Sequence, residues 1–189
     1  FSPEDLSIIK NGPSERRRFL DFELCQLDKI YLYNLTKYNK VLMQRNRLLK
    51  EISFRPDLKS TLPVWNEQLI QYGEKIISRS KLFSEEPNEI IYEIHKEITG
   101  NKEELILTYE PDTDESTFKD ALDAACVRDM KLCSTSVGPH RDDLLFQING
   151  TDIRKYGSQG QQRTCALSLK LSEIELVKKT IHDTPVLLL

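Results

Sequence analysis

The 189-residue sequence has no long apolar run: the longest stretches are a few residues, far short of the roughly 20 that a membrane-spanning helix needs. Glycine and proline are also scarce, at seven and eight residues, while 39% of the residues are hydrophobic. This composition excludes disorder as the main state of the chain. A chain of this length can bury a core as one compact domain or two small ones.

Metal-ligand spacing is missing as well. The four cysteines show no CxxC pair and do not cluster with the three histidines, whereas a zinc site needs four ligands at short paired spacings. We therefore expect no metal, and we interpret each cysteine as a small buried hydrophobe. Unpaired cysteines without a signal peptide are typical of a reducing, cytoplasmic setting. The four are Cys25, Cys126, Cys133 and Cys165.

The net charge of −3 conceals a segregation of charge along the chain. Residues 10–50 carry ten Lys/Arg against four Asp/Glu, a net charge of +6. Residues 85–123 carry thirteen acids against three lysines, a net charge of −10. The basic segment could attract a phosphate backbone with salt-sensitive affinity. The alternative is a solvated helix face that the acidic segment balances in space.

The first hundred residues have the periodicity of helices. Ser2-Pro3-Glu4-Asp5 is typical of a helix start, and Ser14 can cap a second helix over 16–24. Two longer segments, at about 27–52 and 63–83, repeat apolar residues at alternating steps of four and three. With only a short loop between them, they predict an antiparallel helical hairpin. The repeats are Tyr31, Leu35, Tyr38, Leu42, Arg45, Leu49 and Ile52, and Trp65, Leu69, Tyr72, Ile76, Arg79 and Phe83.

Each of these apolar repeats contains one arginine, Arg45 in the first and Arg79 in the second. We expect both to lie at the edge of the repeat and to extend the charged end into water. A functional contact is the alternative. Pro87 is expected to break or restart the helix, and a further helix should end near Gly100. His95 in that helix is expected to be structural.

After about residue 100 the period changes from 3.6 to 2, which favours strands mixed with helices. Asn149-Gly150 is a strong type I′ hairpin signal. The four terminal apolar residues are typical of a central parallel strand buried on both faces. The expected elements are strand 104–110, a helix after Ser116 with Phe118, Leu122 and Ala125, strand 143–148, strand 151–153, polar loop 157–162, helix 164–179 and strand 186–189.

The polar loop and the helix after it carry the most informative motif, Tyr156-Gly-Ser-Gln-Gly-Gln-Gln-Arg-Thr164. It places a serine hydroxyl, a glycine N–H and glutamine amides at a helix N-terminus, where unpaired N–H groups and the helix dipole favour an anion such as phosphate. Gly160 lets the backbone approach a ligand without a Cβ in the way. The alternative is a structural helix cap.

The order of elements and several flanking motifs resemble one known family. A polar Ser-x-Gly-Gln loop, a buried helix, a proline-led turn and an apolar strand resemble the signature region of an ABC-type ATPase head. More specifically, nearly the whole chain resembles the RecF family of bacterial recombination-repair proteins. The motifs are Phe1-Ser-Pro-Glu-Asp-Leu6, Arg16-Arg-Arg-Phe-Leu-Asp21, Gln44-Arg-Asn46, Leu48-Leu-Lys50, Gly138-Pro-His-Arg-Asp-Asp-Leu144 and 157–163.

The resemblance implies a fold of the α+β or α/β kind: a helical lobe II with a long antiparallel hairpin in residues 1–100, then part of an ABC-type head, lobe I, in 101–189. It implies a DNA replication, repair and recombination protein of the SOS response whose full-length form binds ATP, Mg²⁺ and DNA. It also implies an ATP-dependent homodimer that works with RecR and RecO to load RecA at single-strand gaps.

The same resemblance implies roles for individual residues. Ser158 would face the γ-phosphate of ATP held by the opposite subunit, with nucleotide sensing in trans shared by the rest of the signature motif. Those residues are Gln159, Gly160, Gln161, Gln162 and Arg163. No catalytic residue is expected in this chain. Contacts to single-stranded or duplex DNA and gap junctions are expected from Arg16, Arg17, Lys37, Lys40 and Arg47, with at least one of Arg16–Arg18 pointing inward.

Two parts of an ATPase site are not in this sequence. No GxxxxGK[ST] phosphate loop occurs, and no acidic pair follows Leu189. The chain also begins at Phe1 without Met, so we expect a fragment of a longer protein whose full form is a weak DNA-dependent ATPase. The chain alone is expected to be inactive, because phosphoryl transfer needs the phosphate-loop lysine and a metal-holding acid.

His140-Arg-Asp-Asp143 resembles an acid–base or metal cluster only superficially. Adjacent aspartates on a strand point to opposite faces, so we expect a structural role, with Arg141 in a salt bridge to one of them. Two other functions stay open: a non-enzymatic helical module that binds a partner protein, and a coiled-coil scaffold. The scaffold is disfavoured because the apolar repeats are short and strands follow.

Overall fold

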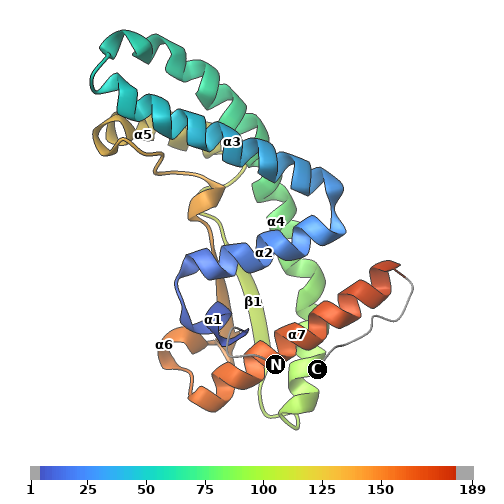
Figure 1. The fold of residues 1–189 in the computed structure, drawn as a ribbon. Helices are drawn as coiled ribbons and strands as arrows, with labels where there is room; N and C mark the ends of the chain where they lie inside the picture. The colour runs from blue at the N-terminus through green and yellow to red at the C-terminus, as the bar shows by residue number, and fades with distance from the viewer. Residues whose placement is uncertain (1–4, 182–189) are drawn as a thin grey trace. The chain divides into compact units, whose positions relative to one another are not determined.

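The computed structural model describes residues 5–181, except for the side chains of 5, 84–87, 177 and 179–181. Its elements form a mostly helical α+β fold with one small sheet, as expected (Figure 1). They are α1 (Asp5–Lys10), α2 (Pro13–Leu27), α3 (Lys29–Ile52), the 3₁₀ helix η1 (Pro56–Thr61), α4 (Leu62–Ile98), β1 (Leu105–Glu110), α5 (Phe118–Leu132), the 3₁₀ helix η2 (Pro139–Arg141), β2 (Asp143–Ile148), β3 (Thr151–Asp152), α6 (Ile153–Tyr156) and α7 (Gln159–Ile181).

The chain divides into two units that alternate along the sequence. The helical unit comprises Leu24–Ser80 and Pro111–Asp142. The sheet unit comprises the residues up to Glu23, Lys81–Glu110 and the residues from Asp143 on. A single cut near residue 100 does not separate them, and the assignment of 1–100 and 101–189 to two lobes stays a prediction.

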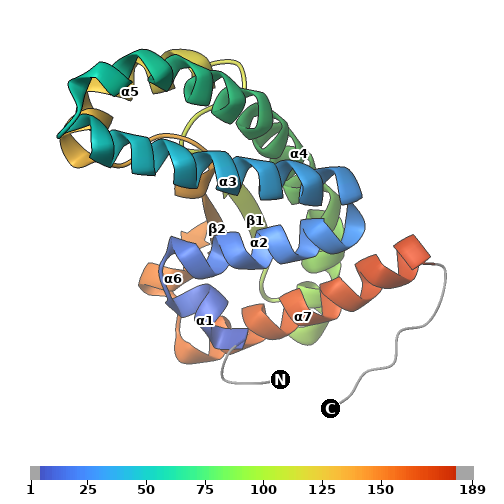
Figure 2. The same ribbon diagram turned by 45° about the horizontal axis from the view of Figure 1, so that its top comes forward.

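In the helical unit, α3 and the first part of α4 form the predicted antiparallel hairpin, joined by η1 (Figure 2). Pairs along the two helices run in opposite order: Tyr33 meets Tyr72, and Arg45 bonds Asn66. Asp28 begins α3, because its Oδ1 accepts the N–H groups of Ile30 and Tyr31 at 2.8 and 3.0 Å.

The apolar residues of α3 pack into the core of this unit. Tyr31, Tyr38, Leu49 and Ile52 of the predicted repeat are buried. One cluster joins Leu48, Leu49 and Ile52 to Leu62 of α4, with Leu58, Trp65, Cys126 and Met130 packed against it. The hairpin is therefore closed by α5 as well as by its own two helices.

The position of Arg45 corrects one expectation. Its side chain is fully buried, and its guanidinium donates to Asn66, Asp129 and Thr135 at 2.7 to 2.8 Å. The expectation that it extends into water is wrong, because α5 supplies a buried carboxylate that compensates the charge. Arg79 does lie at the edge, a quarter exposed, with its Nε 3.0 Å from Asp28.

Pro87 corrects a second expectation. Helix α4 runs from Leu62 to Ile98 in one piece, so the predicted break is wrong. Proline removes one backbone hydrogen bond, a loss that tertiary packing of the neighbouring turns can offset. Phe83 and Ile91, one turn to either side, are each 2% exposed.

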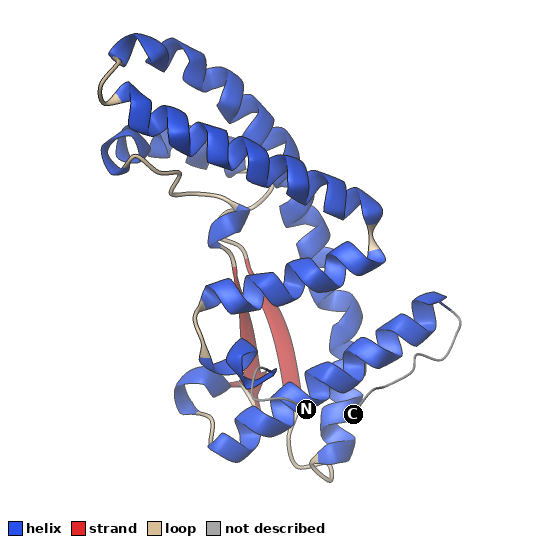
Figure 3. Ribbon diagram, in the orientation of Figure 1, coloured by secondary structure: helices blue, strands red, loops and turns tan. Residues whose placement is uncertain are grey.

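The described strands all lie in the sheet unit, in the order β1-β2-β3 (Figure 3). β1 and β2 pair antiparallel from Leu105 opposite Ile148 to Glu110 opposite Asp143. The predicted turn is confirmed, since Asn149 and Gly150 have φ of 50° and 76°. β3 is shorter than expected, because Ile153 already begins α6.

One face of this sheet is buried by helices. Residues along β1 are alternately buried and exposed. β2 shows the same alternation, with Phe146 among its buried residues. Helix α7 contributes Cys165, Ala166 and Leu169 to the core, and α1 packs on α7. The predicted polar loop over 157–162 is partly wrong: helix α7 already begins at Gln159, because the motif supplies its own cap.

Some expected features lie outside the described residues, namely the cap at Ser2-Pro3 and the strand 186–189. Among the residues that are described, no helix is long and apolar enough to cross a membrane. The same part of the chain holds no group of three or more metal-ligating side chains.

Candidate functional site

The start of α7 is built by a reciprocal pair of hydrogen bonds between Ser158 and Gln161. The N–H of Gln161 donates to Ser158 Oγ at 3.2 Å, and the N–H of Ser158 donates to Gln161 Oε1 at 2.9 Å. This is the Ser-x-x-Gln capping box, which satisfies two backbone donors at once. The sequence therefore stops the loop at Ser158 and leaves the serine exposed at the helix end.

The two glycines of the motif differ in whether the surrounding structure leaves room for a side chain. A Cβ on Gly157 would collide with the backbone oxygen of Ile153, so the fold itself requires glycine there. A Cβ on Gly160 would meet only Ser158 Oγ, at 3.7 Å, an ordinary contact. Nothing among the described residues explains a glycine at 160, which is the position where a bound group would need close approach to the backbone.

The other motif residues divide between surface and core. Gln159 and Arg163 are exposed. Gln162 points inward: it is buried, and its Nε2 donates to the carbonyl of Ile153 at 3.1 Å. The exposed part of the predicted site thus comprises a hydroxyl, first-turn N–H groups and the side chains of Gln159 and Arg163, a donor set that suits a phosphate.

Sequence reasoning missed a polar network beneath this helix start. Gln161 Nε2 donates to Glu103 Oε1 at 3.0 Å, and Glu103 Oε2 lies 3.3 Å from His95 Nε2. His95 Nδ1 lies 2.9 Å from Ser168 Oγ. His95 is fully buried, and burial lowers its pKa despite the opposing effect of Glu103. Because Gln161 and Glu103 are 58 positions apart and His95 and Ser168 are 73 apart, no local signal could have found these two contacts.

The basic residues predicted to contact DNA are not equivalent. Lys40 and Arg47 of α3 are exposed, and the Arg47 side chain, 75% exposed, pairs with Glu51. Lys37 is half-buried with its Nζ 5.4 Å from the Tyr33 ring. Spacings of three and ten residues place all three on one side of α3.

Arg16 and Arg17 lie on α2. The guanidinium of Arg16 holds Asp143 with two hydrogen bonds, at 2.6 and 2.9 Å, and donates to the Asn11 carbonyl. At 2% exposure it is the inward-pointing arginine expected in this triplet, and its burial argues against contact with DNA. Arg17 is half-buried and has interactions of its own.

The His140–Asp143 segment makes contacts to distant residues, and its ion pairing differs from the expectation. Asp143 pairs with Arg16, whereas Arg141 donates to the carbonyl of Thr135 at 3.3 Å. His140 Nδ1 bonds the hydroxyl of Tyr38 at 2.7 Å. The expected salt bridge to Arg141 failed for Asp143 because that carboxylate meets a guanidinium 127 residues away in sequence.

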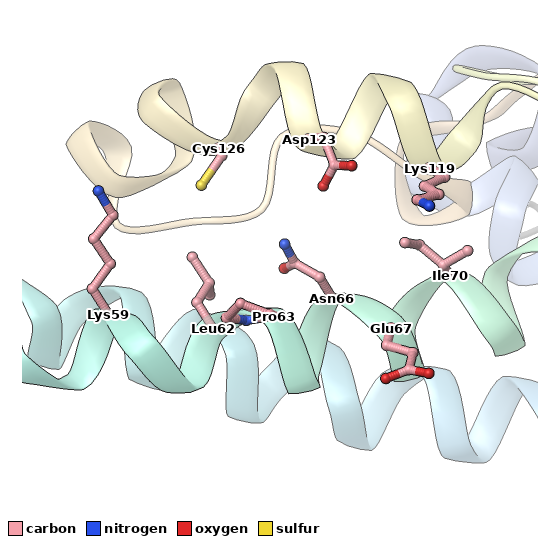
Figure 4. Close-up of a pocket in the computed structure, with 9 residues that line it drawn as sticks. All are labelled: Lys59, Leu62, Pro63, Asn66, Glu67, Ile70, Lys119, Asp123 and Cys126. Carbon is pink, nitrogen blue, oxygen red and sulfur yellow. The ribbon is translucent and has the colours of Figure 1, made fainter.

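The helical unit also holds a groove between α4 and α5 with a volume of about 590 Å³ (Figure 4). Its lining is mainly apolar, with charged groups at the rim. The residues are Lys59, Leu62, Pro63, Asn66, Glu67, Ile70, Lys119, Asp123 and Cys126. No sequence signal singled out this groove.

Comparison with known proteins places this fold among the ABC-type ATPases. The chain superimposes on a solved structure described as the recombination mediator protein RecF-ATP in the RecFOR pathway, with a TM-score of 0.93 and 40% identity over 100% of this chain and 53% of that one. A second, RecF-ATPrS, gives a TM-score of 0.91 and 39% identity over 98% and 52%.

Curated sequences point to one family. A DNA replication and repair protein RecF of Agathobacter rectalis is 67% identical over 189 residues, which is all of this chain and 52% of that protein. The RecF of Acetivibrio thermocellus is 44% identical over 199 residues, covering all of this chain and 54% of that protein. A scan against protein-family models found no match. The chain belongs to the RecF family, and it spans about half the length of the curated relatives it matches.

Proposed function

We propose that this chain contributes the signature motif that completes an ATP site held mainly by a second subunit. The observation that carries the proposal is the Ser158–Gln161 cap, which leaves the serine hydroxyl exposed beside a glycine that the fold does not demand. In this arrangement Ser158 and the first-turn N–H groups bind the γ-phosphate. Gln162 holds the motif to α6 from inside.

The full-length protein, on this proposal, is an ATP-dependent homodimer in the cytoplasm that requires Mg²⁺ and hydrolyses ATP weakly when DNA is bound. It binds DNA at single-strand gaps and works with RecR and RecO to load RecA during the SOS response. The names of its relatives support a role in DNA replication and repair, and two solved relatives are described with nucleotide. The chain by itself has no phosphate loop and does not turn over ATP.

The decisive experiment uses a full-length protein in which this chain replaces the matched half of the Agathobacter rectalis relative. Ser158→Ala should abolish ATP-driven dimerisation, measured by sedimentation, while ATP still binds to each subunit. Ser53→Ala, the same change at an exposed serine on α3's C-terminal end, should have no effect. The proposal would be refuted if the Ser158→Ala protein dimerised at the same ATP concentration as the unsubstituted protein. ATP turnover by the chain alone would also refute it.

A second function, a helical module that binds a partner protein, is favoured by the groove between α4 and α5. An apolar groove with a charged rim suits a short amphipathic segment. Calorimetric titration with RecR and with RecO tests it. If the groove binds either protein, Ile70→Arg should abolish that binding, whereas Lys40→Glu on α3 should not change it.

A further inference from the structure

We infer that Glu103 is a positioning residue for the signature motif: it fixes the orientation of the Gln161 amide and, through that amide, the placement of Ser158. The effect of Glu103 on nucleotide sensing rests on the proposed function. The contacts of Glu103 do not depend on that function. It adds a residue outside the motif, in the loop between α4 and β1, to the set on which nucleotide sensing depends.

The two polar atoms of the Gln161 side chain have different partners. A carboxylate only accepts hydrogen bonds, so the atom of Gln161 that lies 3.0 Å from Glu103 Oε1 must be the amide nitrogen. The amide oxygen is then directed to the N–H of Ser158, 2.9 Å away. Without Glu103 the amide could turn over, which would set its NH₂ group against the Ser158 N–H and break the cap.

His95 lies next to the second carboxylate oxygen of Glu103. It is fully buried, and its lowered pKa keeps the ring neutral at pH 7, so only one ring nitrogen carries a proton. Nε2 lies 3.3 Å from Glu103 Oε2, on the side of the ring that faces the carboxylate. Nδ1 lies 2.9 Å from the hydroxyl oxygen of Ser168 on α7, and that hydroxyl donates to the carbonyl of Thr164 at 2.9 Å.

The chain of contacts therefore begins and ends on one helix. It leaves α7 at Gln161, passes through Glu103 and His95, and returns to α7 at Ser168, two turns further on. Glu103 Oε1 accepts from Gln161, Oε2 lies 3.3 Å from His95 Nε2, and the Glu103 side chain is only 22% exposed. A polar network with both ends on one helix restricts the orientations of its members.

The direct test is spectroscopic and uses the chain itself. The Nε2H₂ group of Gln161, assigned as the ¹⁵N side-chain resonance that disappears in Gln161→Glu, should be displaced and slow to exchange with water. Glu103→Ala should return it to the position and exchange rate of an exposed glutamine. Glu103→Gln should keep it, because the new amide oxygen still accepts the bond. A resonance unchanged in Glu103→Ala would overturn the inference.

The functional test uses the full-length chimaera and an exchange of the two side chains. Gln161→Glu alone sets two carboxylates against each other and should weaken ATP-driven dimerisation about tenfold, the size expected for one lost hydrogen bond to a charged group. Combined with Glu103→Gln, it restores one donor facing one carboxylate, and dimerisation should recover. Failure of the double variant to recover, with its fold intact by circular dichroism, would also overturn the inference.

The two proposals fail in distinguishable ways. If Ser158→Ala leaves dimerisation unchanged, the proposed function is wrong, while the Gln161 resonance still reports on Glu103. If Ser158→Ala abolishes dimerisation but Glu103→Ala alters neither the resonance nor the dimerisation, the function stands and Glu103 has no positioning role.

Discussion

The guanidinium of Arg45 and the carboxylate of Asp129 lie 2.8 Å apart, and both side chains are completely buried. They join the middle of α3 to α5, 84 residues apart in sequence. Asp129 also accepts from the N–H and hydroxyl of Ser136, so each charge has further polar partners. A buried ion pair of this kind is costly to break from one side, because the remaining charge is left without compensation.

Asp129→Ala should therefore lower the free energy of unfolding by about 3–5 kcal/mol, measured by urea denaturation. Asp123→Ala on the same helix, where the side chain is exposed, should change it by no more than about 0.5 kcal/mol. Equal changes in the free energy of unfolding for the two substitutions would contradict this prediction.

Gly138 should tolerate no side chain. Its φ of 125° lies in a region that only glycine adopts readily, and a Cβ there would lie 2.7 Å from the Tyr38 hydroxyl and 2.9 Å from the Phe118 ring. Gly138→Ala should destabilise the chain by about 2 kcal/mol or more through strain and overpacking. Gly100 also has positive φ, 63°, but open space around it, so Gly100→Ala should cost about 1 kcal/mol. Thermal unfolding of both variants checks the difference, and a cost for Gly138→Ala no larger than for Gly100→Ala would contradict it.

Glu23 should make the chain less stable as the pH rises. Burial and, secondarily, the nearby Glu173 raise its pKa from 4.5 to about 7, against the opposing effect of Lys170. The folded state then binds the proton more tightly than the unfolded state, so stability is highest below pH 4.5 for this group. It falls as the pH rises to about 7, by about 3 kcal/mol in all. Glu23→Gln should remove this part of the pH dependence in urea titrations between pH 4.5 and 8, whereas Glu93→Gln, at an exposed site, should not.

The basic side of α3 should determine the salt dependence of DNA binding. Replacing Lys37, Lys40 and Arg47 by Glu should weaken DNA binding at low salt. It should also reduce the slope of log K against log salt by about 3, because binding releases fewer counterions when three phosphate contacts are lost. Fluorescence anisotropy with a gapped duplex measures both. The control replaces the exposed Lys59, Lys75 and Lys131, which keeps the net charge equal. Equal slopes for the two triple variants would refute a specific DNA contact on this side of α3.

The sequence predicted those structural elements whose determinants lie close together along the chain. The Asn149-Gly150 turn needed only its own two residues, because a type I′ turn requires positive φ at both positions. The antiparallel hairpin of α3 and α4 followed from matching apolar repeats. Pro87 shows the limit: propensity predicted a break, but packed neighbours at Phe83 and Ile91 kept the helix continuous.

At the candidate site the same division holds. The sequence identified the Ser158–Arg163 motif and its anion-binding chemistry, but it placed the helix start at Thr164 and treated Gln162 like its neighbours. The capping box moved that start to Gln159, and burial turned Gln162 into a structural anchor. Glu103 gave no signal at all, because its partner lies 58 residues away.

By itself the sequence determined the family, the helical hairpin, the strand pairing at the hairpin turn and the motif at the start of α7, since these rest on residue order and short-range periodicity. The tertiary structure alone decided which charges are buried and what they meet. Arg16 is held by Asp143, and Arg45 is held by Asp129. The physical reason is that a charge can leave water only where a partner is brought to it, and in this chain each such partner comes from a distant segment.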